Sequence, residues 1–307
     1  MAVQIKTVAI VGLGALGTLY GSHLARRMPE DKLRIIADKA RIARYKQERV
    51  YCNGEPLRFN YVAPEESPPP ADLIIFAVKY IHLDQAIKAA ANQVGKDTII
   101  ISLLNGIISE EIIGRVYGMN RLLYCVAQGM DAVKSGNRTT YDNMGILCFG
   151  DREPGIVTEK TTAVADFFTA MEVPHEIDSN MIRRLWGKFM LNVGVNQAVA
   201  VFGENYADIQ KEGRARDIMI GAMKEVIVLA GREGIDLQET DLDYWLSIAD
   251  SLGPRGKPSM RQDIEAERFS EVELFSGTVL QLGKKNGLRT PINQMLFDRI
   301  KSIENQY

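Results

Sequence analysis

The sequence predicts an α/β protein in which a domain with a parallel β-sheet precedes an all-helical domain. Short, almost purely apolar runs alternate with helical stretches in the first half of the chain, which is typical of a parallel sheet covered by helices. Beyond Asp178 the strand signals nearly vanish, and long helical periodicities replace them. The chain has 307 residues, which is long enough for two domains with their own cores. We predict these domains at residues 1–178 and 179–307.

Six apolar runs are the candidate strands of the first domain. The first run leads into glycines and then into a helical stretch from about Ala15 to Arg27, and the second run ends in Asp38. A proline-rich segment at residues 64–70 is interpreted as a surface connection, because strand-like sequence resumes directly after it. The six runs cover residues 7–11, 33–37, 72–78, 98–104, 122–127 and 145–149.

Helical periodicity predicts five helices in the second domain. The last of them begins at Thr290-Pro291, since proline is favoured at the first helical position and threonine as the capping residue before it. The other four are expected at residues 181–202, 214–233, 241–252 and 259–285. The sequence contains no internal repeat and no low-complexity segment.

The bulk composition excludes several classes of function. A net charge of -2 gives no electrostatic footprint for nucleic acid or for an anionic membrane. The three cysteines are widely spaced and form no C-x-x-C pair, which argues for a reducing compartment and against a zinc site. No apolar run approaches the ~18 residues of a membrane span, and no signal peptide is recognisable. We therefore expect a cytoplasmic protein whose partner is a small molecule.

A glycine-rich turn predicts a dinucleotide site. The segment Gly12-Leu13-Gly14-Ala15-Leu16-Gly17 follows the first strand and opens a helix, so its backbone can approach a pyrophosphate at the helix N-terminus. The alternative is a merely structural turn. Asp38 follows the second strand and could accept hydrogen bonds from both ribose hydroxyls of NAD, whereas Lys39 and Arg41 could pair with the 2′-phosphate of NADP. Both cofactors stay open at this point.

Polar residues follow two further strands of the predicted sheet. One run ends at Lys79 and another at Asn105-Gly106. Ligands of open α/β sheets lie outside the carboxyl ends of the strands, so both side chains are candidate ligand contacts. The alternatives are an ordinary surface lysine and a simple Asn-Gly turn.

The helix predicted at 181–202 carries a polar stripe that a purely structural helix would not contain. Lys188, Asn192 and Asn196 recur at every fourth position among apolar neighbours. An unpaired buried amide costs roughly 1–3 kcal/mol and a buried ammonium more, so the stripe is expected to line a wet or ligand-filled cavity. Ser259 and Glu271 are weaker candidates. Ser259 with Gln262 also fits a helix capping box, and a charged residue such as Glu271 on a helix is usually just solvated.

Taken together, these motifs resemble the ketopantoate reductases (2-dehydropantoate 2-reductases), and the match covers essentially the whole chain. The resemblance implies a Rossmann-type domain followed by a helical substrate and dimerisation domain. It also implies NADPH-dependent reduction of 2-dehydropantoate to (R)-pantoate, a step of pantothenate biosynthesis. The motifs that carry it are Gly12-x-Gly14-Ala15-x-Gly17, Val78-Lys79, Asn105-Gly106, Trp186-x-Lys188-x3-Asn192-x3-Asn196 and Pro258-Ser259-Met260-x2-Asp263-x7-Glu271.

The resemblance also implies roles for individual residues. Lys188 resembles the family's proton donor and Glu271 the glutamate that orients the substrate hydroxyl. Many relatives carry a basic residue where this chain has Asp38, so NADH stays an alternative to NADPH. Contacts to the cofactor are implied for Lys79 and Asn105, and contacts to the substrate for Asn105, Asn192, Asn196 and Ser259.

Two other interpretations remain open. The same fold could reduce another branched 2-keto acid, since the helical domain sets substrate selectivity. A dinucleotide-sensing protein without turnover could keep the glycines, yet it would have no need for Lys188 and Glu271. A homodimer is the candidate assembly.

Overall fold

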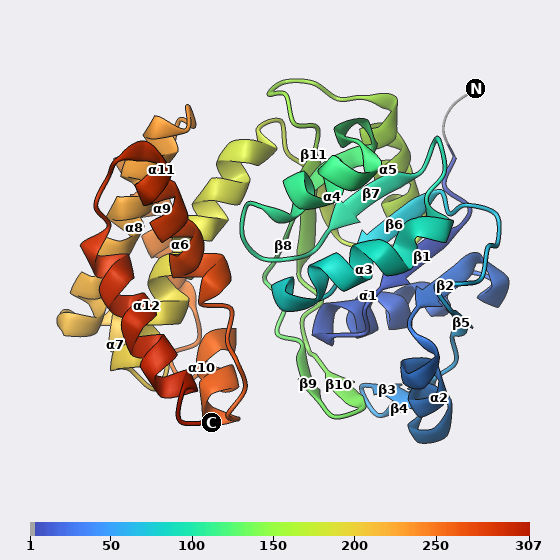
Figure 1. Ribbon diagram of the computed structural model, residues 1–307, viewed down its shortest axis with the longest axis horizontal. Coiled ribbons are helices and arrows are strands. Elements are labelled where there is room, and N and C mark those ends of the chain that lie inside the picture. The colour runs from blue at the N-terminus through green and yellow to red at the C-terminus, as the bar shows by residue number, and fades with distance from the viewer. Residues whose placement is uncertain (1–3) are drawn as a thin grey trace. The chain divides into compact units, whose positions relative to one another are not determined.

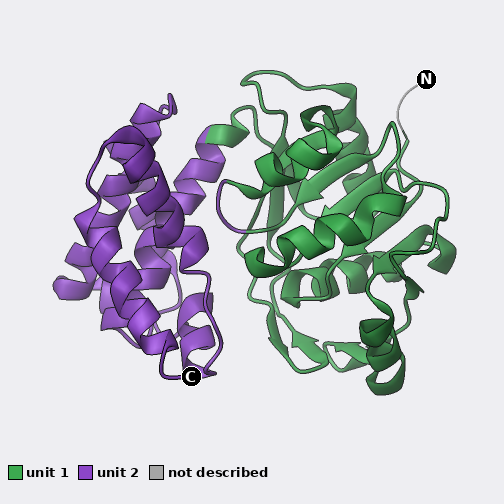
Figure 2. Cartoon of the chain, viewed as in Figure 1, with its two compact units in different colours: residues 1–104, 108–182 green, residues 105–107, 183–307 purple. Residues whose placement is uncertain are grey.

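The computed structural model describes residues 4–307, which divide into two compact units (Figures 1 and 2). Unit 1 comprises the chain up to Leu104 together with Ile108–Ile182, and unit 2 comprises Asn105–Ile107 together with Arg183–Tyr307. Unit 1 is built around a β-sheet and unit 2 consists mainly of helices. The predicted fold class, an α/β domain followed by a helical one, is confirmed.

The larger sheet of unit 1 has the strand order β12-β11-β8-β7-β6-β1-β2-β5. From β5 to β8 all neighbours run parallel, which is the doubly wound order of a dinucleotide-binding fold. The sheet is not purely parallel, however, because β11 pairs antiparallel with β8. Its strands are β1 (Val8–Val11), β2 (Leu33–Ile36), β5 (Asn60–Val62), β6 (Leu73–Phe76), β7 (Ile99–Ser102), β8 (Leu122–Gln128), β11 (Ile146–Gly150) and β12 (His175–Ile177).

Helices cover both faces of this sheet, which explains why its central strands are apolar throughout. Alternate residues of β1 belong to two different cores: Val8 and Ile10 pack with α1 and α5, whereas Ala9 and Val11 pack with α3 and α4. Helices α3 and α4 lie on the viewer's side in Figure 1. The helices of unit 1 are α1 (Ala15–Ala25), α2 (Lys39–Glu48), α3 (Leu83–Ala90), α4 (Ser109–Tyr117) and α5 (Glu159–Ala170).

A second, small sheet contacts α1 and was not predicted from the sequence. Its strands are three residues long and carry mostly polar or half-exposed side chains, so they lack an apolar run. The sheet has the order β4-β3-β10-β9, formed by β3 (Val50–Cys52), β4 (Glu55–Leu57), β9 (Val133–Ser135) and β10 (Arg138–Thr140).

The long helix α6 (Met181–Phe202) belongs to unit 2 from Arg183 onward, and its bounds match the prediction. The predicted helices 214–233 and 241–252 correspond to α8 (Arg214–Arg232) and α9 (Glu239–Ser251). The single helix predicted at 259–285 is wrong, because the chain there forms separate helical segments. The remaining segments of unit 2 are α7 (Ala207–Gln210), α10 (Ser259–Glu265), the π-helix η5 (Glu273–Gly277), α11 (Thr278–Asn286) and α12 (Pro291–Glu304).

The backbone N–H groups at the start of α12 donate hydrogen bonds to a side chain distant in sequence, and not to the expected threonine. Thr290 occupies the N-cap position, but its side chain makes no capping hydrogen bond. The Glu225 carboxylate of α8 instead accepts hydrogen bonds from the backbone N–H groups of Ile292 (2.8 Å) and Asn293 (3.0 Å). An anion at a helix N-terminus also interacts favourably with the helix dipole.

Gly187 allows close packing between α6 and α9. A Cβ atom at this position would overlap the indole nitrogen of Trp245, a buried residue of α9. We therefore expect Gly187→Ala to lower the free energy of unfolding by about 1–3 kcal/mol through overpacking. Urea denaturation measures this loss. Gly231→Ala in α8 is the matched control, since its Cβ would meet no atom within 4 Å. An equal loss in both variants would contradict the packing explanation.

Candidate active site

The polar stripe of α6 lies on a helix whose other side chains are mostly buried. Phe189, Met190 and Val193 are at most 1% exposed, and Asn196 is also buried. Lys188 and Asn192 are partly buried. The helix therefore places an ammonium group and two amides on one face of an otherwise apolar element.

Asn105 connects this stripe to Glu271. The Lys188 Nζ donates a hydrogen bond to the Asn105 Oδ1 (3.2 Å), and the Asn105 Nδ2 donates to the Glu271 Oε2 (3.1 Å). One side-chain amide thus bridges a cation and an anion from segments 83 residues apart in sequence. Because an amide has its acceptor and its donor on opposite sides, both charged partners fix its orientation.

A second chain of hydrogen bonds joins the asparagines to Ser259. The Asn196 Nδ2 donates to the Asn192 Oδ1 (3.3 Å), and the Ser259 hydroxyl donates to the Asn196 Oδ1 (3.2 Å). The capping box considered for Ser259 and Gln262 is wrong, because Pro258 holds the N-cap position of α10 and no side chain caps it. Ser259 instead contacts the stripe of α6.

One donor of this network has no partner among the described residues. The Asn192 Nδ2 is buried and makes no hydrogen bond within residues 4–307. Leaving such a group unpaired costs roughly 1–3 kcal/mol, so it is a favourable contact for an acceptor atom of a bound ligand.

The non-helical segment between α10 and η5 sets the position of Glu271. Glu267 adopts a positive φ of 51°, and Arg268 folds back to pair with Asp263 at 2.9 Å. The buried Glu304 of α12 then accepts hydrogen bonds from the backbone N–H (2.8 Å) and the hydroxyl (2.7 Å) of Ser270, beside Glu271. Sequence reasoning missed Glu304, since only its unusual burial distinguishes it from a surface glutamate.

The glycine-rich loop lies in unit 1 between β1 and α1 and has the geometry that the motif requires. Gly12 has a φ of +99°, and a Cβ there would come within 2.8 Å of the Ala77 carbonyl oxygen. A Cβ on Gly17 would overlap the Gly12 carbonyl oxygen. The first turn of α1 carries no acidic residue, and no side chain caps it. Its free N–H groups can therefore receive phosphate oxygens.

The other two cofactor candidates of unit 1 follow β2 and β6, the strands on either side of β1, at the same edge of the sheet. Asp38 is the N-cap of α2, and its Oδ1 accepts a hydrogen bond from the Arg41 backbone N–H at 2.8 Å. Lys79 is exposed and follows β6, immediately before the short helix η2 (Tyr80–His82). Asp38, Lys79 and the glycine loop thus belong to unit 1, whereas the contacts of the α6 stripe belong to unit 2.

A buried carboxyl group lies in α4, shortly after the Asn105 loop. Burial raises the pKa of Glu110 from its ordinary 4.5 to about 7. Its Oε2 accepts a hydrogen bond from the Ser109 hydroxyl (2.8 Å), which in turn shares a hydrogen bond with the Ser102 hydroxyl (2.9 Å). This network ties α4 to β7 on either side of the loop in sequence.

The raised pKa predicts a stability loss at neutral pH. Between pH 4.5 and 7 the unfolded chain releases the Glu110 proton while the folded protein keeps it, so the contribution of this group falls as the pH rises. We expect a decrease of roughly 3 kcal/mol in the unfolding free energy across this window. Urea denaturation of the wild type and of Glu110→Gln at several pH values measures it. The unfolding free energy of the wild type should fall relative to that of Glu110→Gln by this amount as the pH rises from 4.5 to 7. A constant difference between the two would contradict the assignment.

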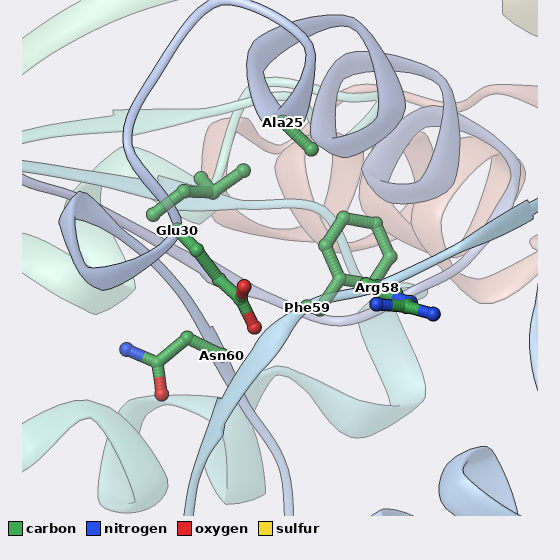
Figure 3. A pocket seen from close by; sticks show the side chains of 6 residues that line it. Ala25, Glu30, Arg58, Phe59 and Asn60 are labelled. Atoms are coloured by element: carbon green, nitrogen blue, oxygen red, sulfur yellow. The ribbon is translucent and has the colours of Figure 1, made fainter.

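Figure 3 shows a pocket in unit 1 at the opposite end of the strands. Leu33 and Asn60, two of its residues, stand at the amino ends of β2 and β5, whereas the glycine loop and Asp38 follow the carboxyl ends of β1 and β2. None of the predicted site residues lines it. Its other lining residues are Ala25, Glu30, Arg58 and Phe59.

The described residues 4–307 form no helix with both the length and the apolar character that a membrane span needs.

A doubly wound sheet with a glycine-rich loop, followed by helices that carry a cationic polar network, defines a dinucleotide-binding oxidoreductase. Comparison with known proteins identifies the family within this class. The family model of ketopantoate reductase PanE/ApbA matches residues 8–154, and the model of its C-terminal domain matches residues 180–304. The chain belongs to the ketopantoate reductase family.

Curated relatives cover nearly the full chain. A 2-dehydropantoate 2-reductase of Streptococcus pyogenes is 23% identical over 301 residues, which is 97% of both chains. A 2-dehydropantoate 2-reductase of Pyrococcus abyssi is 26% identical over 302 residues, again 97% of both chains. These relatives support an oxidoreductase activity for this chain.

Solved structures share the fold. A PanE/ApbA family ketopantoate reductase from Ralstonia eutropha superposes with a TM-score of 0.84 at 24% identity, covering 98% of this chain and 99% of the other. A D-mandelate dehydrogenase in complex with NADH and anilino(oxo)acetate reaches a TM-score of 0.86 at 23% identity with the same coverage.

Proposed function

We propose that this protein reduces 2-dehydropantoate to (R)-pantoate with a reduced nicotinamide dinucleotide, and that Lys188 is the general acid. The observation that carries the proposal is the Lys188–Asn105–Glu271 hydrogen-bonded series, which lines up a proton donor, an amide and a carboxylate. Family membership supports the same reaction.

The glycine loop fits the cofactor. We propose that the backbone from Gly12 to Gly17, including Leu13, Ala15 and Leu16, holds the pyrophosphate at the uncapped start of α1. Asp38 would contact the adenosine ribose, because it ends the segment after β2, next to β1 in the sheet. Lys79 and Asn105 are proposed to contact the nicotinamide half.

The polar network of unit 2 would hold the substrate. The Asn192 Nδ2, which lacks a partner within residues 4–307, is suited to an oxygen of the substrate. Asn196 and Ser259, already hydrogen-bonded to each other, would contact the substrate carboxylate. Glu271 would accept a hydrogen bond from the substrate hydroxyl and so orient it.

The chemistry follows from the charges at the carbonyl. When bound, the reduced nicotinamide supplies a hydride to the keto carbon. Negative charge then develops on the carbonyl oxygen, where the Lys188 ammonium stabilises it and donates the proton. Asn105 accepts a hydrogen bond from the same ammonium and so restricts its direction. The product is the 2-hydroxy acid.

The two predicted domains would divide this work. We propose that residues 1–178 bind the dinucleotide, and that residues 179–307 bind the substrate and form a homodimer. A solved ketopantoate reductase from Staphylococcus aureus is described as dimeric. The proposed reaction would serve pantothenate biosynthesis.

A turnover assay tests the proposal. Loss of the reduced-nicotinamide absorbance is followed with 2-dehydropantoate and with other branched 2-keto acids. We expect the highest kcat/KM with 2-dehydropantoate. A clearly higher value with a keto acid that lacks the hydroxyl would favour the alternative reductase, and no turnover of any keto acid would favour a sensing protein.

A further inference from the structure

We infer that the adenosine end of the dinucleotide site selects NADH against NADPH, and that Asp38 makes this selection. The inference rests on the proposed function only in assuming that a nicotinamide dinucleotide binds at the glycine loop. It departs from the NADPH preference that the family resemblance implies. Four observations on α2 and on the loops beside it carry the inference.

The first observation is the placement of the Asp38 carboxylate. Asp38 follows β2, the parallel neighbour of β1, and β1 leads into the glycine loop. In a doubly wound sheet an acidic residue at this place accepts hydrogen bonds from the ribose hydroxyls. The Asp38 side chain is 54% exposed, so a ligand can reach it.

The second observation is that the fold holds this carboxylate in place and leaves it acceptor capacity. One oxygen accepts the Arg41 backbone N–H (2.8 Å) as the N-cap of α2, and the other lies 3.4 Å from the Arg41 Nε. A carboxylate has about four acceptor positions, so further positions remain for hydroxyl donors.

The third observation is that each nearby cation of α2 already has a partner. Arg41 pairs with Asp38, and the Lys39 ammonium lies 3.0 Å from the Glu65 carboxylate. The Arg44 guanidinium lies over the ring of Tyr45, 5.6 Å from its centroid. A 2′-phosphate would have to displace these partners to gain a counter-charge.

The fourth observation is that the loop after β5 adds further carboxylates to this corner. The loop after β5 lies beside the end of β2, since the Ala37 N–H donates to the Val62 carbonyl (3.2 Å). This loop carries Glu65 and also Glu66, which accepts a hydrogen bond from the Ala63 N–H (2.7 Å). Three carboxylates, at Asp38, Glu65 and Glu66, thus lie at this corner beside the cations Lys39, Arg41 and Arg44. The Asp38 carboxylate repels a phosphate that carries nearly two negative charges, whereas it does not repel a hydroxyl.

Direct binding tests the inference on the full chain. The dissociation constants of NADH and NADPH are measured from nicotinamide fluorescence without any keto acid. We expect the dissociation constant of NADH to be lower than that of NADPH by about tenfold or more, because the carboxylate repels the phosphate dianion of NADPH in water. Equal binding, or tighter binding of NADPH, would overturn the inference.

Two variants and one control test whether Asp38 and Glu65 cause the preference for NADH. Asp38→Asn keeps an N-cap for α2 but removes the charge, so the preference for NADH should fall by about tenfold, mainly through tighter NADPH binding. Glu65→Gln releases Lys39 and should tighten NADPH alone, which keeps the test decisive if Asp38→Asn does not fold. Asp31→Asn, which removes an exposed carboxylate paired with Lys32 before β2, should leave the ratio unchanged. An unchanged ratio in both Asp38→Asn and Glu65→Gln would contradict the role of this corner.

The binding test and the turnover test fail separately. A protein that prefers NADH but does not reduce 2-dehydropantoate would refute the proposed function alone. A protein that reduces 2-dehydropantoate but binds NADPH more tightly would refute the cofactor inference alone.

Discussion

Replacing Lys188 with alanine is expected to lower kcat for 2-dehydropantoate by about 10²–10⁴-fold, the usual contribution of a positioned general acid. The variant loses the ammonium that would neutralise the developing oxyanion and supply the proton. It also removes the donor to the Asn105 Oδ1. Binding of the adenosine and pyrophosphate part of the cofactor in unit 1 should be unchanged, because the glycine loop and Asp38 are untouched.

Lys224→Ala is the matched control for Lys188→Ala. Lys224 lies on α8, is 53% exposed and forms a 3.8 Å ion pair with Glu239. We expect its kcat to stay close to that of the wild type. Steady-state kinetics at saturating cofactor decides the result. A Lys188→Ala enzyme within tenfold of the wild-type kcat would refute the assignment of the general acid.

Replacing Glu271 should change substrate discrimination more than general turnover. A site built to hydrogen-bond a substrate hydroxyl can reject an analogue that lacks it by up to ~10⁴-fold, because its own polar group is then left unpaired. Glu271→Ala is therefore expected to reduce kcat/KM for 2-dehydropantoate far more than for a 2-keto acid without the hydroxyl. Kinetics with both substrates gives the ratio.

Two further variants separate the roles of the Glu271 carboxylate. Glu271→Gln retains an acceptor for the Asn105 amide, so it should keep more activity than Glu271→Ala. Glu273→Ala removes a half-exposed neighbour that pairs with Lys301 at 3.3 Å, and it should leave the discrimination unchanged. Equal losses of kcat/KM on both substrates in Glu271→Ala would mean that the carboxylate only positions Asn105 and does not bind the substrate hydroxyl.

Much of unit 1 was predictable because burial on both faces leaves a clear pattern. Strands such as β6 and β7 are apolar at nearly every position, and Gly12 and Gly17 of the loop lie against backbone atoms that no Cβ could approach. The small sheet was not predictable, since β9 and β10 are short and mostly polar and depend on pairing with each other and with β3.

In unit 2 the sequence identified the residues of the polar network, but it did not predict how the chain arranges them. The i, i+4 spacing identified the stripe of α6 because a helix places such residues on one face. The break after α10 was hidden, because Ala266, Glu267 and Arg268 are all compatible with a helix. Contacts of Arg268 with Asp263 and of Ser270 with the distant Glu304 hold the chain out of helical conformation there. For Ser259, the pairing with Asn196 replaced a local capping pattern in the same way.

An isotope experiment tests the central claim most directly. The protein is incubated with 2-dehydropantoate and NADH that carries deuterium at the transferable position, and the product is analysed by mass spectrometry. The account predicts (R)-pantoate with one deuterium at C2, formed by the wild type and strongly reduced in Lys188→Ala. Absence of pantoate, or pantoate without deuterium, would contradict it.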